Sequence, residues 1–199
     1  MVGAATEVFG QRGYAAASMD DIAAKAGITK PMLYSYFGSK EGLFAACATG
    51  ARDGLEARLR EVAADRDLGF DQRLWRALLT VFEFVDRHRD AWRVLYPGGA
   101  EPAGELGRAA HASRRSMEQL VSRLFADAAR SRGMGEQGAA QAAAMAAGFA
   151  AATIAAASAW ADSPEEPRDL ATLRLMNLVW MGLGRLLDGE MWLPGSGPA

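Results

Sequence analysis

The sequence predicts an all-α protein in which a small N-terminal unit of three helices precedes a larger C-terminal helical part. Half of the 199 residues are hydrophobic, so the chain can bury a sizeable core. Alanine dominates the composition, and runs of valine, isoleucine and threonine are almost absent, which favours helix over strand. Apolar residues recur at helical spacing in segments that glycine and proline separate. Helices joined by turns are therefore expected throughout.

The N-terminal unit is predicted to contain two short helices joined by a tight turn. Ser18 and Asp21 form a capping-box-like pair at the start of the first of these helices. Gly27 suits the residue after that helix, where the backbone is left-handed. Thr29 can cap the second helix, and Pro31 lies in its first turn, where a missing N–H costs little. The pair has the geometry of a helix-turn-helix.

Flanking residues complete this unit. A helix over residues 4–12 is expected to close at Gly13, and Ser39 can cap a further helix that begins at Lys40. Within the second helix of the turn, Leu33 and Phe37 are four residues apart, so both can face the interior. The side chains between them are then expected to face outward.

Further helices are predicted after residue 40 from the same periodicity and punctuation. They are expected over residues 40–66, 71–88, 91–96, 109–132, 137–161 and 168–188, with a Gly- and Pro-rich loop over 98–107.

The segment 137–161 is long enough to cross a membrane, because its 25 residues carry no formal charge. Its content argues against that role. Most of the residues are alanine, polar residues are interspersed, and both flanks, Glu136 and Asp162, are acidic rather than basic. We expect a buried helix whose small side chains let a neighbour approach closely, and no membrane partner.

Charge and cysteine content limit the function. The net charge is −2, whereas residues 1–52 hold five basic and four acidic residues, so any positive surface is local. The single cysteine, Cys47, excludes an internal disulfide framework, and its apolar neighbours indicate a small buried residue rather than a redox sensor. His88 and His111 lie on different predicted helices, and no metal-ligand spacing or catalytic motif is present. With no secretory leader visible, we expect a cytoplasmic protein without metal or cofactor.

Four motifs occur in order within the first 45 residues: FGQRGY, DIAAKAGIT, LYSYF and SKEGL. Their order and spacing resemble the N-terminal signature of the TetR family of bacterial transcriptional regulators. The resemblance implies a helix-turn-helix DNA-binding domain over 1–46 and a helical ligand-binding and dimerisation domain over 47–199. It also implies that the second helix of the motif enters the major groove. The DNA-binding residues expected from it are Ser18, Thr29, Lys30, Pro31, Met32, Tyr34, Ser35, Tyr36 and Lys40.

Some individual roles follow from side-chain chemistry. Tyr34 and Lys40 match family positions that bind phosphates. The ammonium group of Lys30 can reach the N7 and O6 acceptors of guanine. For Met32 and Tyr36 the alternative is that they pack against the linking helix.

On the family pattern, the C-terminal part is expected to bind a small apolar or aromatic ligand in a cavity between helices. For each candidate side chain the alternative is a place in the core. Trp92 and Tyr96, next to the turn at 97–99, are the expected rim. The candidate lining residues are Trp75, Phe82, Trp92, Tyr96, Met117, Phe125, Met145, Phe149 and Trp160.

The family pattern also predicts a homodimer that pairs through the last two helices. Small residues over 147–155 suit close backbone approach, and the leucine face of 170–187 supplies apolar area. A two-fold dimer places its recognition helices about one DNA turn apart, roughly 34–36 Å, on a palindromic operator. The expected function is a repressor that a small molecule releases from double-stranded DNA, with activation as the alternative direction.

Two other classes of function stay open. A helical enzyme would need an acid–base or nucleophile arrangement, and none is visible in the sequence. A small-molecule-binding or scaffolding protein could retain the fold without sequence-specific DNA binding. Selection of a palindromic site from random DNA separates these alternatives from the regulator.

Overall fold

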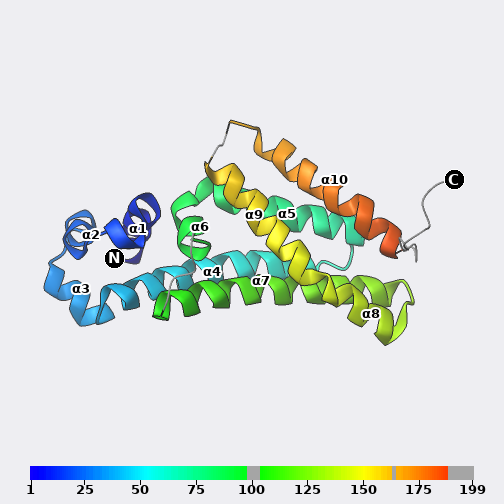
Figure 1. Cartoon of the computed structure of the whole chain (residues 1–199), viewed down its shortest axis with the longest axis horizontal. Helices are drawn as coiled ribbons and strands as arrows, with labels where there is room; N and C mark the ends of the chain where they lie inside the picture. The colour runs from blue at the N-terminus through cyan, green and yellow to red at the C-terminus, as the bar shows by residue number, and fades with distance from the viewer. Residues whose placement is uncertain (98–103, 163–164, 188–199) are drawn as a thin grey trace.

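The computed structural model describes residues 1–97, 104–162 and 165–187, except for the side chains of residues 105 and 182–187. Within these ranges the chain is helical and contains no strand, which confirms the predicted all-α fold. In Figure 1, α1–α3 lie at one end of an elongated molecule, and α4 and α7 run side by side along its length. The helices are α1 (Val2–Ala16), α2 (Met19–Ala26), α3 (Lys30–Phe37), α4 (Lys40–Ala64), α5 (Phe70–Arg87), α6 (Arg89–Leu95), α7 (Gly104–Ser131), α8 (Gly135–Ala144), α9 (Ala146–Asp162) and α10 (Arg168–Leu187).

Helices α2 and α3 form the predicted helix-turn-helix. The Oγ atom of Ser18 accepts a hydrogen bond from the Asp21 amide (3.1 Å), so the predicted cap of α2 is present. Gly27 follows α2 with φ 66° and ψ 31°, a left-handed conformation that a side chain would strain. Gly13, with φ 73°, interrupts α1 where the first helix was predicted to close. Local capping signals therefore fix this part of the fold.

The predicted side-chain cap of α3 is wrong. Thr29 occupies the N-cap position, but its hydroxyl makes no capping hydrogen bond. An N-cap side chain normally accepts from the second or third helical amide. Here the second helical residue is Pro31, which has no N–H, and the third amide, that of Met32, donates to the Thr29 carbonyl (3.0 Å). The hydroxyl of Thr29 therefore has no amide donor left to accept from.

Two hydrophobic clusters form the core and meet along α4. The N-terminal cluster packs α1–α4 together and takes in Val94 from α6 and Leu106 from α7. The C-terminal cluster joins α4–α10. Leu33 is fully buried and Phe37 partly buried, as predicted. Because α4 continues unbroken past residue 46, the predicted division at 46/47 falls inside a helix and stays a prediction.

Two predicted boundaries differ from the structure. Helix α7 begins at Gly104, which has φ 69°, so residues 104–107 are helical. The rest of the predicted loop, residues 98–103, lies outside the described residues. The alanine-rich segment forms two helices, α8 and α9, instead of one. The amide of Met145 donates to the carbonyl of Ala142, three residues back rather than four, and this tighter turn separates them.

Together α8 and α9 are long and apolar enough to cross a membrane by length and composition alone, and 33% of their most apolar window is buried. The core helix of a soluble protein passes the same test. Both helices pack against α7, which places them within the helical assembly.

Cys47 lies in the N-terminal cluster and is 1% exposed, as predicted. Its thiol donates to the Val2 carbonyl (3.6 Å), and burial raises its pKa. Because the thiolate is the reactive form, we expect dithionitrobenzoate to react with the native protein at least about tenfold more slowly than with the denatured chain. Equal rates before and after addition of denaturant would contradict the buried position.

Candidate DNA-binding surface and ligand cavity

The outward face of α3 forms the candidate DNA-binding surface. Leu33 is fully buried beneath it, whereas the side chains of Met32 and Tyr34 are each 42% exposed and that of Tyr36 is 66% exposed. Neither Met32 nor Tyr36 is therefore buried against the linking helix, which was the alternative for both. A short helix presents phenol and thioether groups to solvent, and such groups can contact base edges and phosphates in a groove. The other exposed residues of this segment are Thr29, Lys30, Pro31 and Ser35.

Tyr14 connects the base of this surface to α4. Its hydroxyl donates to Glu41 Oε1 (2.6 Å), and the Lys40 ammonium lies 4.5 Å from the centre of its ring. Lys40 also donates to the Ala15 carbonyl (3.4 Å). Burial and then the bond to Glu41 raise the pKa of Tyr14, so its phenol stays a hydrogen-bond donor. These contacts hold Lys40 at the N-terminus of α4, where the helix dipole also favours a phosphate.

Two basic side chains next to the helix-turn-helix, Lys30 and Arg12, form ion pairs with acidic residues. Lys30 Nζ lies 2.8 Å from Asp20 Oδ2, and Arg12 Nη1 lies 2.6 Å from Asp21 Oδ2. The hydrogen bond to Asp20 raises the pKa of Lys30, so the ammonium stays charged at neutral pH. Both pairs are exposed, and exposed ion pairs contribute little free energy. DNA can therefore replace Asp20 as the partner of Lys30 at small cost.

The hydroxyl of Ser18 is engaged within the protein. It donates to Asp21 Oδ2 (2.7 Å) and accepts from the Asp21 amide. A phosphate at the N-terminus of α2 would meet the free backbone amides of the first turn and would compete with Asp21 for the hydroxyl. The contact of Ser18 with DNA stays a prediction.

Asp20→Asn should strengthen DNA binding. The substitution removes the carboxylate that holds Lys30 and one negative charge beside the recognition helix. We expect the Kd for operator DNA to fall about two- to fivefold at low salt, and the gain to shrink as salt screens the charges. Fluorescence anisotropy at two salt concentrations measures this change. Asp67→Asn, an equal change of charge beyond the far end of α4, is the control, and an unchanged or higher Kd for Asp20→Asn would contradict the competition.

The structure does not bring the candidate ligand residues into one cavity. Of these nine residues, Trp92 and Tyr96 border the large cavity described next. The core alternative describes most of the others, because their rings pack against one another, as Phe82 does against Trp160 at 5.8 Å between centroids. Phe82, Met117, Phe125, Phe149 and Trp160 are buried, Trp75 is half-buried on α5, and Met145 is exposed between α8 and α9.

The large cavity lies where the N-terminal unit meets α6, α7 and α9. Its volume is about 1270 Å³, and residues of α1, α4, α6, α7 and α9 line it. Phe9 and Tyr14 border it from α1, and Trp92 borders it from α6. The indole N–H of Trp92 donates to Ser158 Oγ on α9 (3.0 Å), which fixes α6 against α9. The volume exceeds the range of roughly 300–1,000 Å³ that is typical of small-molecule pockets.

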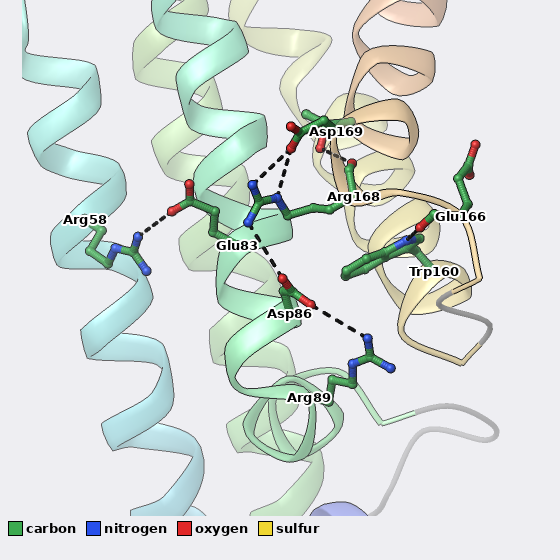
Figure 2. Close-up of polar contacts among 9 residues, drawn as sticks. Arg58, Glu83, Asp86, Arg89, Trp160, Glu166, Arg168 and Asp169 are labelled. Carbon is green, nitrogen blue, oxygen red and sulfur yellow. Dashed lines mark hydrogen bonds and ion pairs between the residues drawn. The ribbon is translucent and has the colours of Figure 1, made fainter.

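A polar network ties the start of α10 to α5 and α6 (Figure 2). Arg168 of α10 and Arg89 of α6 lie 3.7 Å and 3.8 Å from oxygens of the same carboxylate, that of Asp86. The guanidinium carbon of Arg89 lies 5.4 Å from the centre of the Trp160 ring, and the indole N–H of Trp160 donates to the Glu166 carbonyl (2.9 Å). Helix α10, one of the two helices predicted to form the dimer, is thereby connected to α6, which borders the cavity.

A metal site has no candidate in the part of the chain that the structure describes. No group of three or more His, Cys, Asp and Glu side chains could hold an ion there. His88 lies between α5 and α6 with its ring 5.2 Å from that of Phe84, and His111 lies on α7.

Comparisons with known proteins agree with this geometry. The model of bacterial regulatory proteins of the tetR family matches residues 2–47, and that of the tetracyclin repressor-like C-terminal domain matches residues 70–182. The chain is 36% identical over 124 residues to the HTH-type transcriptional activator FasR of Mycolicibacterium smegmatis, across 60% of the chain and 56% of FasR. It is 31% identical over 115 residues to the HTH-type transcriptional repressor KstR2 of Mycobacterium tuberculosis, across 58% of the chain and 56% of KstR2.

The chain thus spans about half the length of these curated relatives. A solved structure covers more of it. The crystal structure of a TetR-like transcriptional regulator from Rhodococcus sp. RHA1 is 34% identical, covers 95% of this chain and 94% of its own, and has a TM-score of 0.73. The chain therefore belongs to the TetR family of bacterial regulatory proteins.

Proposed function

We propose that this protein is a ligand-responsive transcriptional regulator that binds a palindromic DNA operator as a homodimer. The observation that carries the proposal is the outward face of α3. Three large side chains, those of Met32, Tyr34 and Tyr36, are exposed on one short helix whose inner side is buried. Lysines lie at the start of α3 and just beyond its end, so the same surface offers base-reading and phosphate-binding groups. Operator binding also places the protein in the cytoplasm.

The dimer is proposed to pair through α9 and α10. Helix α10 exposes Leu178 (73%) and Met181 (69%), an apolar surface that a partner would cover. Helix α9 exposes small residues at positions 147, 148, 151 and 155, which share one face and permit close approach. A two-fold axis between these helices would set the recognition helices roughly 34–36 Å apart. Sedimentation of the purified protein should show a dimer.

Repression is the proposed direction of control, because a dimer on its operator can obstruct transcription until a ligand releases it. Activation is the second candidate, since FasR is named an activator whereas KstR2 is named a repressor. A reporter driven by the bound promoter distinguishes them. Deletion of the regulator gene raises expression under repression and lowers it under activation.

Selection of binding sites from random DNA at moderate salt tests the proposal. We expect a palindrome with half-sites about one turn apart. Tyr34→Phe and Lys40→Gln should each weaken binding to every sequence by a similar factor, whereas Lys30→Gln should relax specificity at one base pair by about 1–3 kcal/mol. Arg123→Gln, an exposed position on α7, is the control. Equal binding to selected and scrambled DNA would contradict the regulator function and would favour a small-molecule-binding or scaffolding protein.

A further inference from the structure

We propose that Tyr14 is a positioning residue for the contact of Lys40 with a DNA phosphate. The face of its ring supports the Lys40 ammonium without neutralising it, and its hydroxyl holds the Glu41 carboxylate away from that ammonium. The proposal rests on the DNA binding proposed above and names a residue that the sequence did not predict for this surface.

Lys40 differs from the other basic side chains of residues 1–52, all of which the structure describes, because it alone forms no ion pair with a carboxylate. The other four are paired: Arg12 with Asp21, Lys25 with Glu7, Lys30 with Asp20, and Arg52 with Asp53 and Glu56. A phosphate has to displace an acid from each of these four cations. At Lys40 it meets no such competitor, so the partner that Lys40 has instead of an acid decides how well it binds DNA.

That partner is the ring of Tyr14, which two buried aromatic side chains hold in place. The ring stacks on Phe9 with 5.9 Å between centroids and meets Phe44 edge-on with 5.4 Å between centroids. Gly13, directly before it, has φ 73°, and this left-handed residue interrupts the helical path of α1. Lys40 Nζ lies 4.5 Å from the ring centre, within the range of a cation–π contact. Such a contact orients the ammonium but leaves its charge intact, so the ammonium can still bind a phosphate.

The hydroxyl of Tyr14 engages the acid that follows Lys40 in the chain. It donates to Glu41 Oε1 (2.6 Å), and this hydrogen bond, before any other contact, lowers the pKa of Glu41. The carboxylate is therefore charged at neutral pH. Glu41 is exposed, so without the hydroxyl its carboxylate is free to turn toward Lys40, whose ammonium contacts the same ring. An ion pair between them would neutralise Lys40 and place a negative charge where the phosphate binds.

A purely structural role for Tyr14, in which it only fills space between α1 and α4, makes different predictions. A structural residue would affect DNA binding through the stability or orientation of the whole unit, whatever side chain stands at position 41. A positioning residue should affect DNA binding only while Glu41 carries its charge and Lys40 is present to contact DNA. The coupling between variants at these three positions therefore separates the two roles.

The test is a set of double-mutant cycles on the full-length protein, with the operator selected from random DNA as the probe. Tyr14→Phe keeps the ring and its packing but frees Glu41. At about 0.1 M salt we expect Kd to rise about three- to tenfold, and the slope of log K against log salt to become less steep by up to about 0.9, because one phosphate contact is lost. Tyr14→Phe with Glu41→Gln should have a Kd within about twofold of that of Glu41→Gln alone. Fluorescence anisotropy over a salt series measures these values, and thermal unfolding shows that each variant is folded.

Glu61→Gln, the same change of charge at an exposed position of α4, is the matched control and should not restore binding to Tyr14→Phe. With Lys40→Gln present, Tyr14→Phe should change Kd by less than about twofold, because the contact that it serves is already absent. Three results would overturn the proposal: wild-type binding by Tyr14→Phe, an undiminished loss with Glu41→Gln, or an undiminished loss with Lys40→Gln. Each of them leaves operator binding by the wild type intact, so the proposal alone fails. If the wild type binds scrambled DNA as well as the operator, the regulator function fails and the proposal fails with it.

Discussion

Replacing Trp92 with alanine should lower the free energy of unfolding by about 3–5 kcal/mol, the usual cost of truncating a buried aromatic side chain. Trp92 is 1% exposed, contacts Tyr96 and donates its indole N–H to Ser158. The substitution removes apolar burial, enlarges the neighbouring cavity and leaves the Ser158 hydroxyl without this donor. Thermal unfolding at fixed protein concentration measures the loss, at roughly 2–4 °C in Tm per kcal/mol for a chain of this size.

Trp75→Ala is the matched control, because Trp75 is half-buried on α5 and does not line the cavity. Its loss should stay below about 2 kcal/mol. Ser158→Ala separates the hydrogen bond from the packing and should cost about 1–3 kcal/mol, since it leaves the buried indole N–H unsatisfied. Equal losses of stability for Trp92→Ala and Trp75→Ala would contradict the role of Trp92 in packing α6 against α9.

The helix-turn-helix could be predicted because its determinants are local. The cap at Ser18 depends on an amide three residues away, and the turns at Gly13 and Gly27 depend on the conformation of a single residue. Such signals lie within one helical turn of the sequence. The error at Thr29 is local too. Pro31, two residues after Thr29, removes one of the amides that the threonine side chain would need as a donor.

The cavity could not be predicted, because distant residues build it. Trp92 meets Ser158, which lies 66 positions away, and Gln11 donates to Asp90, which lies 79 positions away. Helical periodicity marks the apolar face of each helix but does not say which faces meet or where they leave space. For the same reason the aromatic candidates scattered along the chain fell mostly in the core. Arg114 and Arg115 of α7 border the cavity, and nothing in their local sequence indicates that α1 and α6 lie beside them.

The candidate DNA-binding surface combines local features, which the sequence predicts, with contacts between distant residues, which it does not predict. The exposure of Tyr34 and Tyr36 follows from the helical spacing of their buried neighbours. The resemblance to the TetR family predicts Lys30 and Lys40 on this surface. The ion pair of Lys30 with Asp20, in contrast, depends on how α2 crosses α3. Tyr14 was not among the predicted site residues. Its place in the FGQRGY motif was the signal available, and only the structure shows its bond to Glu41 on another helix.

Gly10→Ala should destabilise the protein by about 1–3 kcal/mol, because it overpacks the contact between α1 and α6. Gly10 is buried in α1, and a Cβ atom there would overlap the Cα and Cβ atoms of Asp90 and lie 2.7 Å from its carbonyl oxygen. Backbone atoms cannot swing aside as a flexible side chain can, so α1 must move away from α6. Chemical denaturation measures the loss of stability, and operator titration measures the effect of the displaced α1 on DNA affinity.

Gly54→Ala is the matched control, because it makes the same chemical change inside α4 where a Cβ meets no described heavy atom within 4 Å. Alanine is favoured over glycine in a helix, so this variant should gain about 0.5–1 kcal/mol. Opposite signs for the two variants would show that the approach of α1 to α6 decides the result at Gly10, whereas a gain in both would contradict it. Because α1 also carries the start of the DNA-binding unit, a shift of α1 at Gly10 should lower DNA affinity together with stability.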